Sequence, residues 1–243
     1  MTDPVGVSRI TPEQVFKMFQ VFGERRSGTN FASALLAKNT PLKEVSQFGW
    51  KHGIPSFPVF PKSCLFVVIL RDPIDWLKAL YRAPFEVAPG IQDLPFREFI
   101  RCEWESVYTP RKSGWRGHGY ELDFSLGRGE ILQLDRHPVE GRRYRNVLEL
   151  RNVKLAGHLS LLSRSTNCVV VRYEDVNRDP EHLLSVVRDV FRIPVRDKAL
   201  LLKQRVGPSS PKQNAITDLS AADMEHIKKH LDLAQELRCG YPL

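Results

Sequence analysis

The sequence lacks a long apolar run, a close cysteine pair and an internal repeat, and each absence narrows what the chain can be. No apolar stretch approaches the ~20 residues that a membrane-spanning helix needs. The first fourteen residues show no basic region followed by an apolar one, so we expect a soluble, cytoplasmic protein. The four cysteines form no Cys-x-x-Cys pair, which predicts reduced thiols and neither a disulfide framework nor a metal site.

The charge is less balanced than the rest of the composition. The chain has 36 Lys and Arg against 28 Asp and Glu, a net charge of +8. Such an excess suits an anionic ligand or polymer, or it serves solubility alone, and it carries no information about the fold. Composition therefore leaves the function to the motifs.

Apolar runs alternate with helical patterns along the 243 residues, a length that a single domain (1–243) can account for. The expected strands cover 15–23, a short stretch within 43–53, 64–70 and 167–171, although residues 11–13 would also suit the start of a short helix. The expected helices cover 31–38, 73–82, 96–105, 147–162, a segment beginning at 180 and 221–239.

Strands that alternate with helices favour an α/β fold with an open, mostly parallel β-sheet flanked by helices. At about 106–146 the pattern gives way to a segment rich in Gly, Arg, His and aromatic residues. We interpret this segment as an insertion that covers the substrate. Ligands of such folds collect at the carboxyl ends of the strands, so the residues that follow each expected strand are the candidates for a site.

The stretch "FGERRSGTNF" follows the first expected strand. Gly23 and Gly28 bracket four residues, as in the phosphate-binding pattern G-x-x-x-x-G-K-[ST], but Thr29 and Asn30 stand where that pattern has Lys and Ser or Thr. A glycine turn that enters a helix aims backbone N–H groups at an anion. Arg26 adds a planar, permanently charged fork that suits phosphate oxygens.

Two further strand ends carry side chains suited to the same site. Arg71 directly follows the apolar run 64–70, where it either meets an anionic ligand or pairs with Asp72 or Asp75. His52 follows the second expected strand, beside Lys51. An imidazole suits general-base chemistry near neutral pH, and a structural role for this histidine is the alternative.

Together, "ERRSGTN", "RDPIDWLKALYR" and "VVVRYEDVNRDPEHL" resemble the three signature segments of the sulfotransferases that use 3′-phosphoadenosine 5′-phosphosulfate (PAPS). The resemblance implies a P-loop NTPase-like sulfotransferase architecture. It also implies sulfuryl transfer from PAPS, without a metal, to a hydroxyl or amine of an acceptor such as a small molecule or a glycan. The implied catalytic residues are His52 as base, with Arg26 and Lys51 as cations.

The resemblance also assigns residues to the binding of PAPS. The loop residues around the 5′-phosphosulfate are Arg25, Arg26, Ser27, Gly28, Thr29 and Asn30. Arg71 matches the arginine that holds the 3′-phosphate, and Tyr173 matches the tyrosine near the adenosine. Ala79 stands where the family has a serine, which removes one hydroxyl from the 3′-phosphate site. The late basic motif is echoed only by Arg205 and Lys212.

Two other functions remain open at this level: a P-loop kinase or nucleotide-binding protein, and a basic protein that binds nucleic acid or another polyanion. For a sulfotransferase, the basic and aromatic segment offers acceptor contacts at Arg111, Lys112, Trp115, His118, Arg142 and Arg143. Arg151, Lys154 and His158 have the spacing of one helix face, which either borders the acceptor or is solvated. The sequence identifies no specific nucleic-acid module and no oligomeric state.

Overall fold

The computed structural model describes residues 4–9, 14–107, 133–165, 167–200, 216 and 218–243. Within them lies a five-stranded sheet of order β1-β7-β4-β2-β3. Its strands are β1 (Gly6–Arg9), β2 (Met18–Phe22), β3 (Lys43–Glu44), β4 (Cys64–Leu70) and β7 (Asn167–Arg172). All pairs are parallel except β1 with β7, so the expected mixed α/β fold with a mostly parallel sheet is confirmed.

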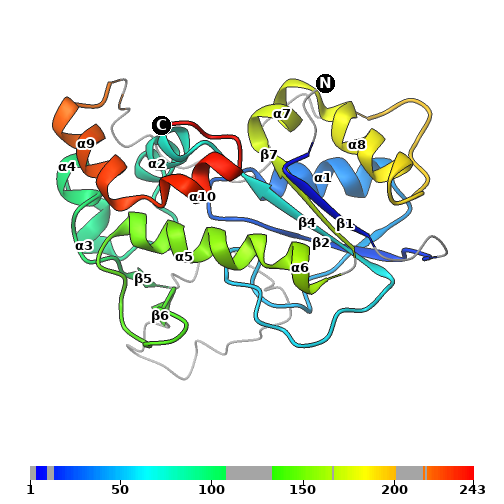
Figure 1. Cartoon of the computed structure of the whole chain (residues 1–243), viewed down its shortest axis with the longest axis horizontal. Coiled ribbons are helices and arrows are strands. Elements are labelled where there is room, and N and C mark those ends of the chain that lie inside the picture. Colours follow the sequence, from blue (N-terminus) through cyan, green and yellow to red (C-terminus); the bar gives the residue numbers. More distant parts are fainter. Residues whose placement is uncertain (1–3, 10–13, 108–132, 166, 201–215, 217) are drawn as a thin grey trace.

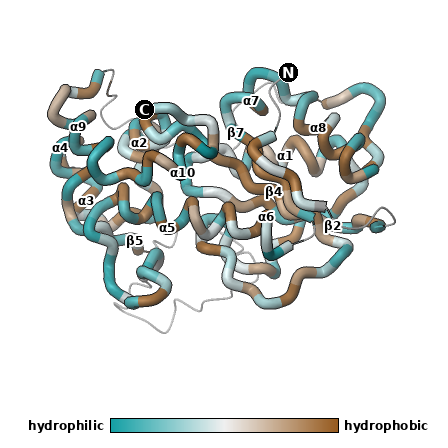
Figure 2. The backbone as a smooth tube through the Cα atoms, viewed as in Figure 1, coloured by the Kyte–Doolittle hydropathy of each residue, from teal (hydrophilic) through white to brown (hydrophobic). Residues whose placement is uncertain are grey.

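Helices cover both faces of this sheet (Figure 1). α1 (Thr29–Asn39) and α8 (Pro180–Asp189) pack on one face, and α5 (Val147–Leu159) and α6 (Leu161–Arg164) pack on the other. Successive side chains of β4 alternate between these two layers, with Val67 and Ile69 on the α1 side and Phe66 and Val68 on the α5 side. This burial on both faces explains the unbroken apolar run of β4, and the hydrophobic residues are concentrated along the central strands (Figure 2).

A third apolar cluster lies beyond the carboxyl edge of the sheet. It joins the start of α5 to α2 (Pro73–Arg82), α3 (Pro89–Gln92), α4 (Phe96–Phe99) and α9 (Ala221–His230). Trp76, Trp104 and Tyr144 are fully buried there. The remaining elements are the antiparallel pair β5 (Ser106–Val107) and β6 (Gln133–Leu134), with α7 (Tyr173–Arg178) and α10 (Leu233–Arg238).

Several expected elements differ from those observed. The short second strand lies within 43–53 as expected but is only Lys43–Glu44, and the chain then turns at Gly49, where φ is 99°. The helix expected over 96–105 is the single short turn α4. The helix expected over 221–239 is two helices, since Leu231 is extended and buried and the Asp232 carboxylate accepts a hydrogen bond from the Gln235 backbone to begin α10. No helix of the described residues is long and apolar enough to cross a membrane.

Candidate functional site

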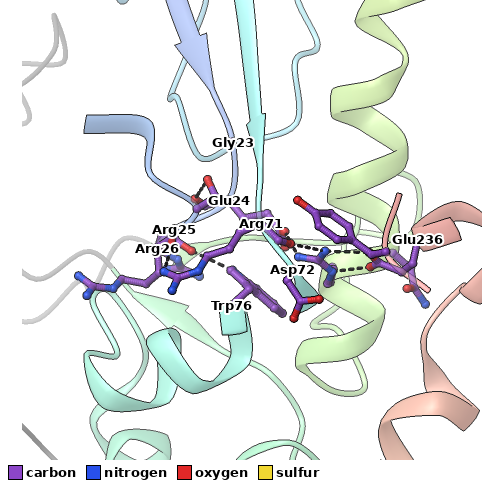
Figure 3. Close-up of polar contacts among 12 residues, drawn as sticks. Gly23, Glu24, Arg25, Arg26, Arg71, Asp72, Trp76 and Glu236 are labelled. Carbon is purple, nitrogen blue, oxygen red and sulfur yellow. Dashed lines mark hydrogen bonds and ion pairs between the residues drawn. The ribbon is translucent and has the colours of Figure 1, made fainter. Parts of the chain in front are cut away.

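The carboxyl ends of β2, β4 and β7 bring four of the expected site residues together. Arg71 leaves the end of β4, and its Nη1 donates a hydrogen bond to the carbonyl oxygen of Arg26 at 3.0 Å. The Arg71 guanidinium lies 4.9 Å from the centre of the Tyr173 ring, at the start of α7. Tyr173 in turn packs on Gly28. Arg26 and Arg71 therefore share one side of the sheet edge, beyond the strand ends (Figure 3).

The loop between β2 and α1 has the geometry of an anion cradle. Gly28 has φ of 100°, which places it in the left-handed region, and a Cβ there would lie 2.3 Å from Cδ2 of Tyr173. Within the described chain, no acceptor meets the backbone N–H groups of Gly28, Thr29 and Asn30. Such N–H groups at a helix N-terminus form a site for an anion.

Two of the expected loop residues turn their side chains inward. Arg25 is only 5% exposed, and its guanidinium pairs with Asp135 and donates to Ser106 Oγ at 2.8 Å. The Ser27 hydroxyl donates to the Glu24 carbonyl oxygen at 2.7 Å. The cofactor contact expected from the Arg25 side chain is therefore replaced by an internal ion pair. Arg26 projects the other way, with its guanidinium 5.8 Å from the centre of the Phe85 ring.

His52 lies in a turn that is bonded directly to this loop, and not at a strand end as expected. Its Nδ1 is 2.8 Å from the carbonyl oxygen of Gly23. Because a carbonyl oxygen only accepts, Nδ1 carries the hydrogen and Nε2 keeps its lone pair. Burial, followed by the charge of Lys51, holds the pKa of His52 well below 6.5. The imidazole is therefore neutral at neutral pH and able to accept a proton at Nε2.

Lys51 joins the same turn to the other end of the loop. Its Nζ donates to the side-chain oxygen of Asn30, and its carbonyl oxygen accepts from the Gly23 N–H at 3.0 Å. Burial lowers the pKa of Lys51 below 10.5. The three expected catalytic residues, Arg26, Lys51 and His52, thus adjoin one loop.

Arg71 does not form the ion pair that was its alternative role. The Asp72 carboxylate instead accepts hydrogen bonds from the backbone of Ile74 and Asp75 at the start of α2. Among the described residues, Arg71 pairs with no carboxylate, and its Nε is buried without a hydrogen-bond partner. A buried guanidinium nitrogen without a partner is the kind of donor that a bound anion satisfies.

Backbone strain collects around Arg25. Four non-glycine residues of the described chain have a positive φ, and three of them adjoin Arg25. Arg26 follows Arg25 in the chain and has φ of 69°. The Glu86 carbonyl oxygen accepts a hydrogen bond from the Arg25 guanidinium at 3.1 Å, and the Asp135 carboxylate pairs with the same guanidinium. Strain of this kind costs ~1–3 kcal/mol per residue and clusters at functional sites.

The polar face of α5 is buried, which excludes the solvated alternative for Arg151, Lys154 and His158. Arg151 donates to Glu24 at 2.7 Å, to the carbonyl oxygen of Arg71 at 2.9 Å and to Glu236 on α10. Lys154 Nζ donates to the carbonyl oxygen of His52 at 2.6 Å. His158 Nε2 is 3.1 Å from the Gly53 carbonyl oxygen, and burial lowers the pKa of its imidazole to about 3.

Sequence reasoning missed four acidic residues that hold the site: Glu24, Asp135, Glu174 and Glu236. Glu24 and Glu236 meet on the Arg151 guanidinium, although 212 positions separate them in the sequence. Glu174, next to Tyr173, accepts the Asp72 N–H at 3.0 Å and the Tyr241 hydroxyl at 2.9 Å. The position of Glu24 inside the glycine loop was a local signal, whereas the others depend on contacts across the fold.

The remaining expected residues are paired within the protein, buried, or outside the described residues. Arg142 pairs with Glu140 and Glu149, and Arg143 pairs with Glu103 and Glu105, so these arginines make contacts within the protein. Ala79 is buried on α2. The expectations that lie outside the described residues concern Arg111, Lys112, Trp115, His118, Arg205 and Lys212.

Gly28→Ala tests the contact between the loop and Tyr173, and Gly49→Ala is its matched control. Both glycines have φ near 100°, but a Cβ at Gly49 meets nothing within 4 Å. We expect Gly28→Ala to cost roughly 1–3 kcal/mol more than Gly49→Ala in urea unfolding, because of overpacking. In a Tyr173→Ala background this difference should disappear, and equal costs in the wild-type background would contradict the contact.

Glu24→Gln tests the buried carboxyl group. Burial is the main reason that the pKa of Glu24 rises from 4.5 to about 7, with Arg151 opposing the shift and Glu236 adding to it. The folded state therefore binds more protons than the unfolded state between these two values, so Glu24 makes stability fall as pH rises from 4.5 to 7. We expect the stability of the wild type relative to Glu24→Gln to fall by about 3 kcal/mol over this window. Urea unfolding measures it, with the exposed Glu44→Gln as control, and parallel pH profiles of wild type and Glu24→Gln would contradict the assignment.

Comparison of the chain with models of protein families, with curated proteins and with solved structures found no match. The basis for a function is therefore the arrangement at the strand ends. There the start of α1 lies beside two arginines, Arg26 and Arg71, and the ring of Tyr173. The neutral imidazole of His52 is bonded to the same loop.

Proposed function

We propose that the protein is a sulfotransferase that moves a sulfuryl group from PAPS to a hydroxyl or amine of an acceptor. The observation that carries the proposal is the continuous contact from Arg26 through Arg71 and Tyr173 to Gly28, with His52 bonded to the same loop. Cations at two strand ends suit a ligand with two separate anionic groups.

The residues at the strand ends fit the chemistry of PAPS. The N–H groups of Gly28, Thr29 and Asn30 and the Arg26 guanidinium would hold the 5′-phosphosulfate. Arg71, whose Nε lacks a partner among the described residues, would hold the 3′-phosphate. The family serine at position 79 is replaced by a buried alanine, so more of the 3′-phosphate contact falls to Arg71.

PAPS supplies a sulfuryl group that is already joined to a phosphate leaving group. A lysine for a γ-phosphate and a hydroxyl for magnesium are then not needed, which agrees with Thr29 and Asn30 in their places. His52 would accept the acceptor's proton at Nε2. Arg26, together with Lys51, would stabilise the negative charge that develops on the leaving oxygen.

The acceptor is assigned only as a hydroxyl or amine. The glycan expected from the sequence depended on residues within 108–132, which lie outside the described residues. It also depended on Arg142 and Arg143, which pair with glutamates.

Binding of adenosine 3′,5′-bisphosphate is the first test, because this product carries both phosphates of PAPS. We expect it to raise the melting temperature without magnesium, since a ligand of the folded state stabilises it. Arg26→Met and Arg71→Met should each weaken its binding roughly 10- to 100-fold, the effect of losing a charged hydrogen bond. Arg145→Met, whose side chain is 80% exposed, should leave the affinity unchanged.

Other outcomes of the same titration would point to other functions. Stabilisation by ATP with magnesium, and none by the bisphosphate, would indicate a nucleotide kinase. Steep, salt-dependent binding of oligonucleotides without bisphosphate binding would indicate a polyanion-binding protein. Either result would overturn the proposal.

The role of His52 is tested by turnover with labelled PAPS and a panel of hydroxyl and amine acceptors. We expect His52→Ala to lower kcat roughly 100- to 10,000-fold, the usual contribution of a general base, with the affinity for the bisphosphate retained. His226→Ala on α9 is the control, since that ring contacts the Ile100 carbonyl oxygen beside the third apolar cluster. Wild-type turnover by His52→Ala would exclude it as the base.

A further inference from the structure

Lys154 is buried in the middle of α5 and is only 2% exposed. Lysines are almost never buried so fully unless they are paired, and Lys154 pairs with Asp135. Its Nζ also donates to the carbonyl oxygen of His52 at 2.6 Å and lies 5.0 Å from the centre of the Trp50 ring. One buried ammonium group therefore contacts both Trp50 and His52, the residues on either side of Lys51.

His52 is held at its two ends. Its main chain is held by Lys154, and its ring is held by the Gly23 carbonyl oxygen, 2.8 Å from Nδ1. The Trp50 ring packs edge-on against the imidazole, with 5.6 Å between ring centres. The position of the His52 backbone decides which ring nitrogen reaches the Gly23 carbonyl oxygen. Because Lys154 fixes that backbone, it also determines which nitrogen of the ring carries the hydrogen.

The same lysine connects the turn to the phosphate loop. The Asp135 carboxylate pairs with Lys154 and also with Arg25, which is the residue before Arg26. The turn and the loop therefore share one buried carboxylate. A displacement of Lys154 would change the spacing between the base and the anion cradle.

We propose that Lys154 is the positioning residue of the general base. It holds His52 so that Nδ1 donates to Gly23 and Nε2 keeps its lone pair for the acceptor. This inference rests on the proposed function only in taking His52 as the general base. The geometry of the imidazole can be measured without any turnover.

Three cations lie around the imidazole, and the Asp135 carboxylate pairs with two of them, Arg25 and Lys154. Lys51, Arg25 and Lys154 all lower the pKa of His52, after burial, and the Gly23 carbonyl oxygen opposes them. Removal of the Lys154 charge should therefore move the titration of His52 toward neutral pH. Loss of the bond to the His52 carbonyl should at the same time release the ring from a single tautomer.

Lys154→Met is the test, and Lys154→Arg is the conservative variant. Nitrogen NMR of the imidazole, assigned by comparison with His52→Ala, reports the tautomer and the titration of His52. We expect a single Nδ1–H tautomer in the wild type and a mixture in Lys154→Met. Turnover should fall on the order of 100-fold, as for a displaced catalytic group, with bisphosphate affinity within about 2-fold. Lys154→Arg should restore most of the single tautomer and most of the turnover.

Asn152→Ala is the control on the same helix. Asn152 donates to the His230 carbonyl oxygen and accepts from the Asp232 N–H, so it bonds the segment between α9 and α10 and not the His52 turn. This variant should keep the His52 tautomer. If Lys154→Met fails to fold, Lys154→Gln, which also removes the charge and leaves Asp135 paired with Arg25, takes its place and is judged by the same outcomes.

A folded Lys154→Met protein with the wild-type tautomer and titration of His52 would overturn the inference. A changed tautomer in a protein whose wild type transfers no sulfuryl group would overturn the proposed function alone. The two failures are therefore distinguishable.

Discussion

The fully buried guanidinium of Arg151 is the constraint on which the site depends. It joins the loop after β2 through Glu24, the end of β4 through the Arg71 carbonyl oxygen and α10 through Glu236, while the guanidinium lies over Trp76 of α2. A buried charge is costly unless it is paired, and loss of one partner leaves the others uncompensated, at ~3–5 kcal/mol. Four separate elements are therefore held in one arrangement.

This interaction belongs to a larger buried network of ion pairs. Its three cationic side chains are Arg25, Arg151 and Lys154, and its three carboxyl groups are Asp135, Glu236 and Glu24, whose pKa is raised to about 7. Burial alone would raise the pKa of Asp135, but Lys154 and Arg25 outweigh it, so the pKa lies below 3.8. The network replaces apolar packing where loops, and not strands, must be fixed in place. Directional hydrogen bonds fix the position of a loop, whereas apolar contacts alone would allow it to shift.

The elements of the sheet were predictable because local pattern determines them. The run 64–70 matches β4, since a strand covered on both faces admits only apolar residues. The glycine loop and α1 follow from the same local logic. The short second strand was predicted within the right segment, although it ends at Glu44, earlier than expected. The single long final helix was wrong, because the capped Asp232 begins a second helix where apolar periodicity continues.

The candidate site was predictable only in part. Arg25 and Arg26 are neighbours with the same side chain, and the sequence cannot say which one faces a ligand. The left-handed backbone of Arg26 separates them, so that one enters the interior and the other leaves it. The partners of Arg151 lie 127 and 85 positions away, beyond the reach of any periodicity.

The left-handed residues around Arg25 have a consequence for engineering. Arg26, Glu86 and Asp135 occupy backbone conformations in which glycine would be relaxed. A search for thermostable variants would therefore select glycine at Arg26 but not at Asp135, whose carboxylate pairs with the buried Arg25 and Lys154, and the gain at Arg26 would delete a side chain of the candidate site. The most stable version of this fold and the most competent version of its site are different sequences.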